Sequence, residues 1–429
     1  MKHPSIIAAF IIASLSAFAQ SNYDYATSSK GSPDKHALPA ADASPTSFSL
    51  EIKELSPDMI FNEATGYGFE HPGIFSITLP DGNYKVTLTI GDAKRKASTV
   101  VRAECRRLML DRIDTRKGEL VERSFIVNKR SPAINSRDTV KLNPREVNTM
   151  SWDDKLSLEF NGSAPAVKSI KIEPADSVTT IFLCGNSTVV DQPTEPWASW
   201  GQIIPAYFDN DISIANHAES GESISSFLAR KRFDKILSTA RPGDWIFVEF
   251  GHNDQKEKGP GSGAYYNFTT NLKVLVDKAR QAKLNILFIT PTARRSFDEN
   301  GLIQNTHGDY PDAMRAVAKR ENVPLIELNE MTKTLYEAMG IEGSKKAFVH
   351  YTAKTFPHQT KALADNTHFN PYGATQVAKC IIEGLRKAAP QLAAHILRTE
   401  RFNPSTPDDF QSFQWPPAPL YSIEKPLGN

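Results

Sequence analysis

One serine, one aspartate and one histidine of this chain stand in settings that could support acyl transfer. Ser187 lies in the segment Gly185-Asn186-Ser187-Thr188, and Asp365 precedes His368 by three residues. A serine hydroxyl is a weak nucleophile near neutral pH and needs a nearby base, a role that an imidazole can fill. A carboxylate beside that imidazole fixes its tautomer and stabilises the imidazolium ion. We therefore predict ester hydrolysis with Ser187 as nucleophile, His368 as base and Asp365, expected in a turn, as the orienting acid.

Two other segments could stabilise the oxyanion that forms in such a reaction. Gly221 ends the segment that starts at Asn216, and Asn253 lies in Gly251-His252-Asn253-Asp254. Donors aimed at an oxyanion are usually the largest catalytic contribution, and losing one costs roughly 3–4 kcal/mol. The candidates are the backbone N–H groups of Ser187 and Gly221 and the side-chain amide of Asn253. Each motif alone also fits an ordinary turn or helix cap, so the interpretation depends on their joint order.

These residues require a scaffold that brings distant segments together. Five short apolar runs in the second half of the chain are typical of buried parallel strands. The runs are Thr180–Cys184, Ile212–Ala215, Trp245–Phe250, Ile286–Ile289 and Leu325–Leu328. The candidate residues follow the ends of these strands, and parallel sheets bind ligands outside the carboxyl ends of their strands. The sequence thus predicts one cleft.

Stretches with helical spacing lie between and after the apolar runs. One helix is expected to hold Ile224, Phe227 and Leu228 and to continue through Ile236 and Leu237. Further helices are predicted around 272–279, around 314–318 and from Pro371 to about Lys387. Strands that alternate with helices indicate a doubly wound α/β domain over about residues 178–390.

The regions before and after this domain have a different texture. Alternation such as Tyr84, Val86, Leu88 and Ile90, with turn residues between short strands, predicts an antiparallel β-sandwich over about 48–174. Residues 20–47 are rich in Ser, Ala, Asp and Pro and are expected to form a flexible leader. Residues 391–429 are expected to pack over a surface as an extended tail.

The first 19 residues fit a secretory signal peptide. A basic start precedes an apolar run from Ile6 to Leu15, and Ala17-Phe18-Ala19 fits a cleavage site. The run is shorter than the ~20 residues of a spanning helix, although an uncleaved anchor remains the alternative. We expect an exported protein, periplasmic or extracellular. The three cysteines are too few for a disulfide framework, so buried thiols are expected.

The charge balance excludes several classes of partner. The 429 residues carry 50 Lys and Arg against 49 Asp and Glu, a net charge of +1. Without a basic patch or arm, nucleic-acid binding is not expected. No membrane insertion is expected either, and we expect a monomer.

The four motifs, in this order, resemble the blocks of the SGNH (GDSL-like) hydrolases. Longer strings over about residues 178–390 resemble the rhamnogalacturonan acetylesterase group within them. They are Asn186-Ser187-Thr188-Val189, Pro196-Trp197-Ala198-Ser199-Trp200-Gly201-Gln202, Asn216-His217-Ala218, Phe250-Gly251-His252-Asn253-Asp254-Gln255 and His368-Phe369-Asn370-Pro371-Tyr372-Gly373. One position departs from the family pattern, because Asn186 stands where Asp is more usual.

The resemblance implies a flavodoxin-like three-layer fold with a five-stranded parallel sheet, a serine nucleophile, and neither metal nor cofactor. It also implies that the substrate is acetylated pectin of the plant cell wall, from which acetyl groups are removed. The front half resembles the galactose-binding-like domain that precedes such esterases in some bacterial pectin-degrading proteins, a similarity that includes the segment 152–156.

Candidate substrate-binding residues carry a weaker signal. Arg294 and Arg295 follow the fourth predicted strand and could pair with galacturonate carboxylates, or form salt bridges within the protein. Trp197 could stack on a sugar ring, whereas Trp200 is expected to begin a core-facing helix. The insertion before Asp365, with Lys345, Lys346, His350 and Lys354, is expected to be a solvated loop.

Three other functions stay open at this point. The esterase could act on acetylated xylan or on a lipid-like acyl ester. A glycan-binding protein with an inactive hydrolase domain is a second alternative, motivated by Asn186 and by the large β region. A zinc-dependent deacetylase has little support, because the chain lacks His-Glu-x-x-His and its histidines lack ligand spacing.

Overall fold

The computed structural model describes residues 48–418 and 424–427. All described residues belong to one compact unit. The predicted signal peptide, 1–19, and the predicted leader, 20–47, lie outside the described residues. Within the described ranges, none of the helices combines the length and the apolar character that a membrane crossing needs.

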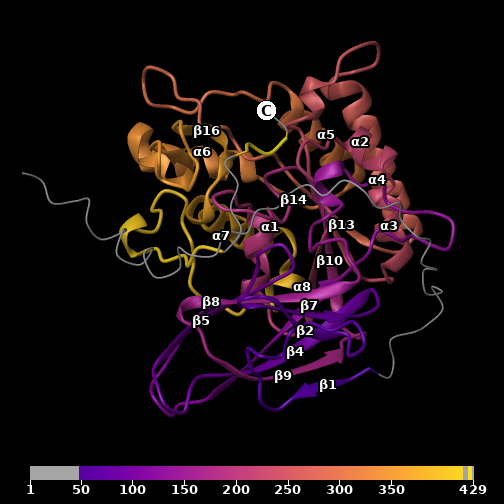
Figure 1. The fold of residues 1–429 in the computed structure, drawn as a ribbon. Coiled ribbons are helices and arrows are strands. Elements are labelled where there is room, and N and C mark those ends of the chain that lie inside the picture. Colours follow the sequence, from indigo (N-terminus) through magenta and orange to yellow (C-terminus); the bar gives the residue numbers. More distant parts are fainter. Residues whose placement is uncertain (1–47, 419–423, 428–429) are drawn as a thin grey trace, which may run out of the picture. The chain divides into compact units, whose positions relative to one another are not determined.

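The front part of the described chain consists of two antiparallel sheets, as predicted (Figure 1). The four-stranded sheet has the order β1 (Leu50–Ile52), β9 (Val167–Pro174), β4 (Gly82–Ile90) and β7 (Val121–Lys129). The five-stranded sheet has the order β2 (Tyr67–His71), β3 (Ile74–Thr78), β8 (Lys155–Ala164), β5 (Ala97–Ala103) and β6 (Arg107–Thr115). The alternation of apolar and polar residues fixes the register between strands. In β4 and β9, for example, fully buried Val86 and Leu88 lie opposite Ile172 and Ile170.

A five-stranded parallel sheet follows, which confirms the predicted α/β fold class. Its order is β11 (Ile212–Asn216), β10 (Thr179–Gly185), β12 (Trp245–Glu249), β13 (Asn285–Ile289) and β14 (Leu325–Ile326). An additional antiparallel pair consists of β15 (Phe348–Tyr351) and β16 (Leu363–Phe369).

Helices cover both faces of the parallel sheet. The α-helices are α1 (Trp200–Ile203), α2 (Ile224–Ala229), α3 (Arg232–Thr239), α4 (Thr269–Gln281), α5 (Tyr310–Glu321), α6 (Leu328–Gly343), α7 (Pro371–Ala388) and α8 (Pro390–Ala393). Short 3-10 helices are η1 (Pro144–Glu146), η2 (Ile204–Tyr207), η3 (Asp254–Lys256), η5 (Ser344–Ala347) and η6 (Phe410–Ser412), and η4 (Ala264–Phe268) is a π-helical turn.

Alternate residues of β10 face opposite layers. Ile181 and Leu183 pack with α1, α6 and α7, whereas Phe182 and Cys184 pack with α2 to α5. Figure 1 shows these two groups of helices on the two sides of the sheet. Because both faces are covered, every position of β10 is apolar or small, as the continuous apolar run predicted. As expected, all three cysteines are buried and unpaired.

Two local predictions are wrong. The single helix predicted across residues 224–237 is broken into α2 and α3, because Lys231 between them has a left-handed backbone with φ 61°. The insertion expected as a solvated loop is one only in part, because η5 and β15 hold Lys345, Lys346 and His350, whereas Lys354 lies in the largely exposed loop 352–362. Strand β15 pairs with β16, so Asp365 and His368 lie on a strand rather than in a turn.

The sandwich contacts the loops that follow the parallel strands through buried polar groups. Arg107 of β6 is fully buried, and its Nε and Nη2 lie 3.0 and 2.8 Å from Asp191 Oδ2. The other oxygen of Asp191 accepts from Asn216 Nδ2 at 2.8 Å. Arg106 donates to the carbonyl of Trp197 at 2.8 Å and pairs with Glu195. The sandwich therefore anchors the loop between β10 and α1.

A second set of contacts joins the β7–β8 connection to the loop after β11. Arg145 pairs with Glu219, and Asn143 Nδ2 lies 3.4 Å from Glu222 Oε1. The ring of Trp152 meets His217 edge-on, with centroids 5.6 Å apart. Two of the segments that carry candidate catalytic groups, the loops after β10 and β11, thus rest against the sandwich.

The described part of the segment after α8 runs back along both parts of the structure. Trp415 Nε1 donates to Glu195 Oε1 at 2.8 Å, and the Arg102 guanidinium lies 4.1 Å from the Trp415 ring centre. The carbonyl of Pro417 accepts from Asn161 Nδ2 at 2.8 Å. This C-terminal strap, residues 413–418, contacts β5, β8 and the loop before α1.

Gly201→Ala is expected to lower the free energy of unfolding by about 1–3 kcal/mol or more, because α1 has no room for a side chain here. A Cβ at position 201 would lie 2.1 Å from the Val189 carbonyl oxygen. Gly343→Ala is the matched control: its nearest neighbour would be Met339 Cβ at 3.9 Å, and alanine favours helix there. Urea unfolding of both variants checks this expectation, which equal stabilities would contradict.

Candidate active site

The three residues with predicted chemistry meet at one end of the parallel sheet. Ser187 Oγ donates to His368 Nε2 at 2.8 Å, and His368 Nδ1 donates to Asp365 Oδ2 at 2.8 Å. Ser187 follows directly after β10, whereas the other two residues lie on β16. The side chains of His368 and Asp365 are 1% and 3% exposed. The arrangement can therefore relay a proton from the hydroxyl to the imidazole.

Asp365 is held as a carboxylate by several donors. Its Oδ1 accepts the backbone N–H groups of Thr367 at 2.7 Å and His368 at 2.9 Å. Burial alone would raise the pKa of Asp365, but the bonds and charge of His368 and these N–H groups outweigh it and lower the pKa well below the usual range. Lys425 Nζ also lies 3.3 Å from Asp365 Oδ2.

The nucleophile loop is fixed by Asn186, the residue that departs from the family pattern. Asn186 Oδ1 accepts from Thr188 N at 3.1 Å, and its carbonyl accepts the N–H groups of Val189 and Val190. Gln192 Nε2 donates to the Ser187 carbonyl at 2.9 Å. An amide at position 186 thus retains the turn's hydrogen bonds without a carboxylate's charge.

The candidate oxyanion donors are held by neighbouring loops. Gly221 has φ 84°, a backbone conformation that favours glycine. Asn253 Nδ2 donates one N–H to the Glu222 carbonyl at 3.0 Å, and Lys256 Nζ lies 3.1 Å from Asn253 Oδ1. These bonds fix the amide plane, and an amide nitrogen has a second N–H.

Asp254 connects the loop after β12 to the start of α2. Its two oxygens accept from Gly251 N at 2.8 Å and Ile224 N at 2.9 Å. Burial raises the pKa of Asp254 to about 7. Its bond to Ile224 anchors the segment that follows Gly221.

Glu249, the last residue of β12, holds the nucleophile loop through hydrogen bonds to its side chains, a role that the sequence analysis did not predict. Glu249 Oε1 lies 3.0 Å from Thr188 Oγ1 and 3.1 Å from Thr292 N, and its other oxygen accepts from Trp200 Nε1. Burial raises the pKa of Glu249 to about 7. Glu249 lies inside the run Trp245–Phe250 that predicted a buried strand, so the one charged residue of that run was the available signal.

Glu249 is expected to contribute a loss of stability as pH rises from about 5 to 8. The folded state holds its proton up to about pH 7, whereas the unfolded chain releases it near pH 4.5. The contribution is therefore complete below pH 4.5 and is lost through pH 7. Urea unfolding at several pH values should show that Glu249→Gln reduces this loss by roughly 2–3 kcal/mol. An unchanged pH slope in the variant would contradict the assignment.

The three predicted substrate residues lie in different environments. Trp197 is 2% exposed, and its ring meets the His368 ring edge-on with centroids 5.8 Å apart. Arg295 is buried and donates to Ser344 Oγ and Asn366 Oδ1, both at 3.0 Å. Arg294 is half-buried and donates to the carbonyls of Thr306 at 3.1 Å and His252 at 3.2 Å. The structure thus surrounds Trp197 and Arg295 with protein atoms, and their predicted substrate contacts stay predictions.

Arg294 belongs to a group of cations near Asn253. Burial, together with the nearby charges of Arg294 and Lys425, lowers the pKa of Lys256 to about 8. Lys256 reaches Asn253 directly. The sequence reading gave no role to Lys256 or Lys425, because neither lies in a motif.

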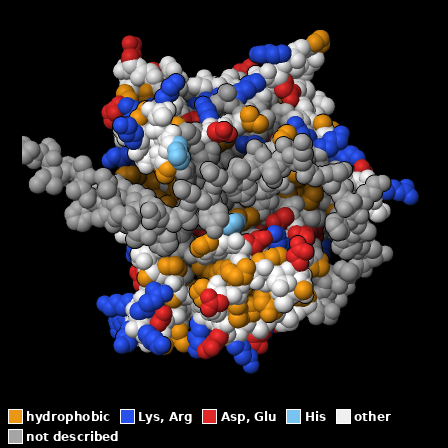
Figure 2. Space-filling model, viewed as in Figure 1, with side chains coloured by type: hydrophobic (Ala, Val, Ile, Leu, Met, Phe, Trp, Pro, Cys, Tyr) orange, Lys and Arg blue, Asp and Glu red, His pale blue; other side chains and the backbone are white. Residues whose placement is uncertain are grey.

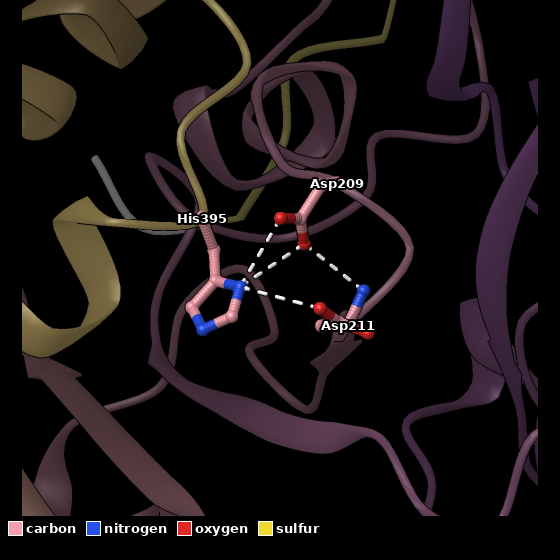
Figure 3. Close-up of side chains that lie close together, drawn as sticks. All are labelled: Asp209, Asp211 and His395. Atoms are coloured by element: carbon pink, nitrogen blue, oxygen red, sulfur yellow. Dashed lines mark hydrogen bonds and ion pairs between the residues drawn. The ribbon is translucent and has the colours of Figure 1, made fainter.

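One group of potential metal ligands occurs among the described residues, and it shares no member with this site. His395 Nδ1 lies 3.1 Å from Asp209 Oδ2 and 3.8 Å from Asp211 Oδ2, as Figure 3 shows. His395 also accepts the Asp209 N–H with its carbonyl. These contacts form an ion-paired link between the loop before β11 and the end of α8.

Comparisons with known proteins show what the chain is similar to. Residues 176–375 match the model of the GDSL-like lipase/acylhydrolase family. Over 222 residues the chain is 41% identical to rhamnogalacturonan acetylesterase RhgT of Bacillus subtilis (strain 168), a match that covers 51% of this chain and 95% of that protein.

A longer match extends beyond this region. The chain is 24% identical over 329 residues to the uncharacterized esterase YxiM of Bacillus subtilis (strain 168), which covers 75% of this chain and 76% of that protein. The crystal structure of Bacillus subtilis YxiM aligns with a TM-score of 0.46 at 21% identity, covering 79% of this chain and 98% of that chain.

Proposed function

Because the chain belongs to the GDSL-like lipase/acylhydrolase family and is a hydrolase of carboxylic esters, we propose that it is an exported carbohydrate esterase that removes O-acetyl groups from rhamnogalacturonan in pectin. The observation that carries this proposal is the continuous relay from Ser187 through His368 to Asp365, with both donor–acceptor distances at 2.8 Å. The predicted signal peptide supports export.

In the proposed first step, Ser187 Oγ attacks the acetyl carbonyl carbon while its proton passes to His368 Nε2. The carbonyl oxygen becomes an oxyanion, which accepts from the N–H groups of Ser187 and Gly221 and from the Asn253 amide. When this intermediate collapses, the bond to the sugar oxygen breaks and His368 returns the proton to that oxygen. The products are a deacetylated sugar and acetyl-Ser187.

In the second step, water replaces the sugar. His368 takes a proton from water as the remaining hydroxide attacks the acetyl carbon, and collapse returns the proton to Ser187 Oγ and releases acetic acid. Asp365 stabilises the imidazolium in both steps and remains a carboxylate. The cycle uses only side chains and backbone of this chain and requires neither metal nor cofactor.

The substrate assignment has two supports. RhgT, at 41% identity, is named a rhamnogalacturonan acetylesterase. The cations Arg294 and Lys256 lie beside Asn253 and carry the charge that a galacturonate carboxylate needs. We assign these two side chains to the uronate next to the acetylated sugar.

Acetate release from a polymer panel tests this proposal. We expect kcat/KM to be higher on acetylated rhamnogalacturonan than on acetylated xylan or on long-chain acyl esters. Arg294→Gln should raise KM on the pectic substrate about tenfold and leave hydrolysis of 4-nitrophenyl acetate unchanged. Arg320→Gln, an exposed arginine on α5, is the matched control.

The outcomes separate the alternatives. A higher kcat/KM on acetylated xylan would contradict the pectin assignment but leave the esterase. Glycan binding without acetate release would favour an inactive binding protein.

A further inference from the structure

A polar cavity of about 160 Å³ lies between the sandwich and the α/β part, apart from the candidate active site. Its lining comes from the ends of β4 and β7, from β10, and from α3 and the loop after it. None of the residues that line it belongs to the triad or to the candidate oxyanion donors. The cavity therefore needs its own explanation.

The cavity has more cationic than anionic side chains on its wall. Lys129, Arg130, Lys235 and Arg241 face Asp81, Asp176 and Asp244. The carboxylates already have partners, which lie within the protein. Asp81 pairs with Lys129 at 3.1 Å and Lys235 at 2.7 Å, Asp176 pairs with Arg241 at 3.6 Å, and Asp244 accepts the N–H groups of Thr180 and Arg241 at 2.8 Å. No carboxylate of the lining remains for Arg130.

Arg130 is buried, with 4% of its surface exposed, and it forms no salt bridge with the described residues. Within the described part of the chain, its Nε and Nη1 atoms have no hydrogen-bond partner. Asp191 is already engaged by Arg107, and burial raises the pKa of nearby Glu104 to about 8, which leaves that carboxyl largely protonated at pH 7. Buried cations without a partner are rare because their desolvation is costly.

Other contacts compensate Arg130 only in part. Its guanidinium lies 4.4 Å from the centre of the Trp152 ring, and that face attracts a cation. The N–H groups of the guanidinium point outward in its own plane, however, so the ring face above that plane cannot accept hydrogen bonds from them. Two further buried atoms on the same wall have no hydrogen-bond partner among the described residues, His217 Nδ1 and Asn128 Oδ1.

We propose that this cavity binds a small oxyanion, either inorganic sulfate or phosphate or a small carboxylate, with Arg130 as its principal charge partner and Lys129 and Lys235 beside it. Water alone would satisfy the unpaired hydrogen-bond donors but would leave the excess positive charge of the cavity wall without a counter-charge. The bound anion links β7 of the sandwich to α3 and β10 of the α/β part. The site does not depend on the proposed esterase function.

Thermal unfolding of the full chain with sodium sulfate tests the site. The wild-type midpoint should rise and saturate at concentrations up to about 20 mM, whereas general salt effects rise without saturation. Arg130→Met should weaken the apparent affinity at least about tenfold. Arg241→Gln, whose side chain is 59% exposed on the same wall, should keep it within about twofold. Equal responses of wild type and Arg130→Met would overturn the proposal.

A diffraction measurement on the wild type covers the case in which Arg130→Met does not fold. Crystals grown with selenate, an analogue of sulfate with anomalous scattering, should show a selenium peak within hydrogen-bond reach of the Arg130 guanidinium. Ordered water only at this position would overturn the proposal. Comparing sulfate, phosphate and acetate in the melting experiment identifies the preferred class of anion.

Discussion

Ser187→Ala is expected to lower kcat for acetate release by roughly 10⁴-fold or more, with little change in KM. The alanine methyl group fills the same buried position, but the variant lacks Ser187 Oγ, the atom that would attack the substrate carbonyl and that bonds His368. Binding by the cations and by the oxyanion donors is retained, so the loss should appear in kcat. Initial-rate kinetics on acetylated rhamnogalacturonan measure it.

A control is needed because any variant can lose activity by unfolding. Ser225 lies on α2, away from the relay, and Ser225→Ala removes its half-buried hydroxyl, which forms hydrogen bonds with Asn271 and Glu257. It should retain the parent kcat, and both variants should unfold near the parent midpoint. Parent-level acetate release by folded Ser187→Ala would exclude the acyl-enzyme mechanism.

Asp191→Ala is expected to lower the free energy of unfolding by about 3–5 kcal/mol. It would leave fully buried Arg107 with a charge and no carboxylate partner, since Nε and Nη2 both donate to Asp191. It would also release Asn216 at the end of β11. Urea unfolding gives the change directly.

A double-mutant cycle distinguishes a lost partner from lost packing. Replacing Arg107 and Asp191 together with leucine should recover much of the stability, because no charge is then buried alone. Asp277→Ala, which removes the exposed Lys273–Asp277 pair, should cost less than about 1 kcal/mol. A cost at Asp191 as small as at Asp277 would show that the buried pair is not needed.

Patterns that act over a few residues were predictable from the sequence. The apolar runs at Thr180–Cys184 and Ile286–Ile289 predicted buried parallel strands, and Pro371 marked the start of α7. Because Ser187 and His368 follow or end strands of one layered domain, their proximity could be anticipated. Their catalytic roles stay predictions until the variants are measured.

Features that depend on contacts between distant residues could not be predicted from such local patterns. The break at Lys231 lacks the glycine that usually marks a left-handed position. Arg107 and Asp191 are 84 residues apart, and nothing in their spacing indicates a buried pair. The strand that carries Asp365 has four consecutive polar residues, Asp365 to His368, so it lacks the alternation that predicts a strand, and it pairs with β15.

The surface carries little information about either site. On the face drawn in Figure 2, lysine and arginine side chains lie among aspartate and glutamate side chains, in agreement with the net charge of +1. The groups with unusual electrostatics, such as Glu249 and Arg130, are buried. Composition therefore could not reveal them.

The C-terminal strap has a consequence for the order of events during synthesis. Its Trp415 contacts Arg102 from the front part of the chain and Glu195 from the middle. The ribosome synthesises these partners well before it reaches the strap. The sequence separations are 220 residues for Glu195 and Trp415 and 314 residues for Arg102 and Pro416. Nascent chains can thus build both sheets early. The last seam between them closes only once residues 413–418 have been made.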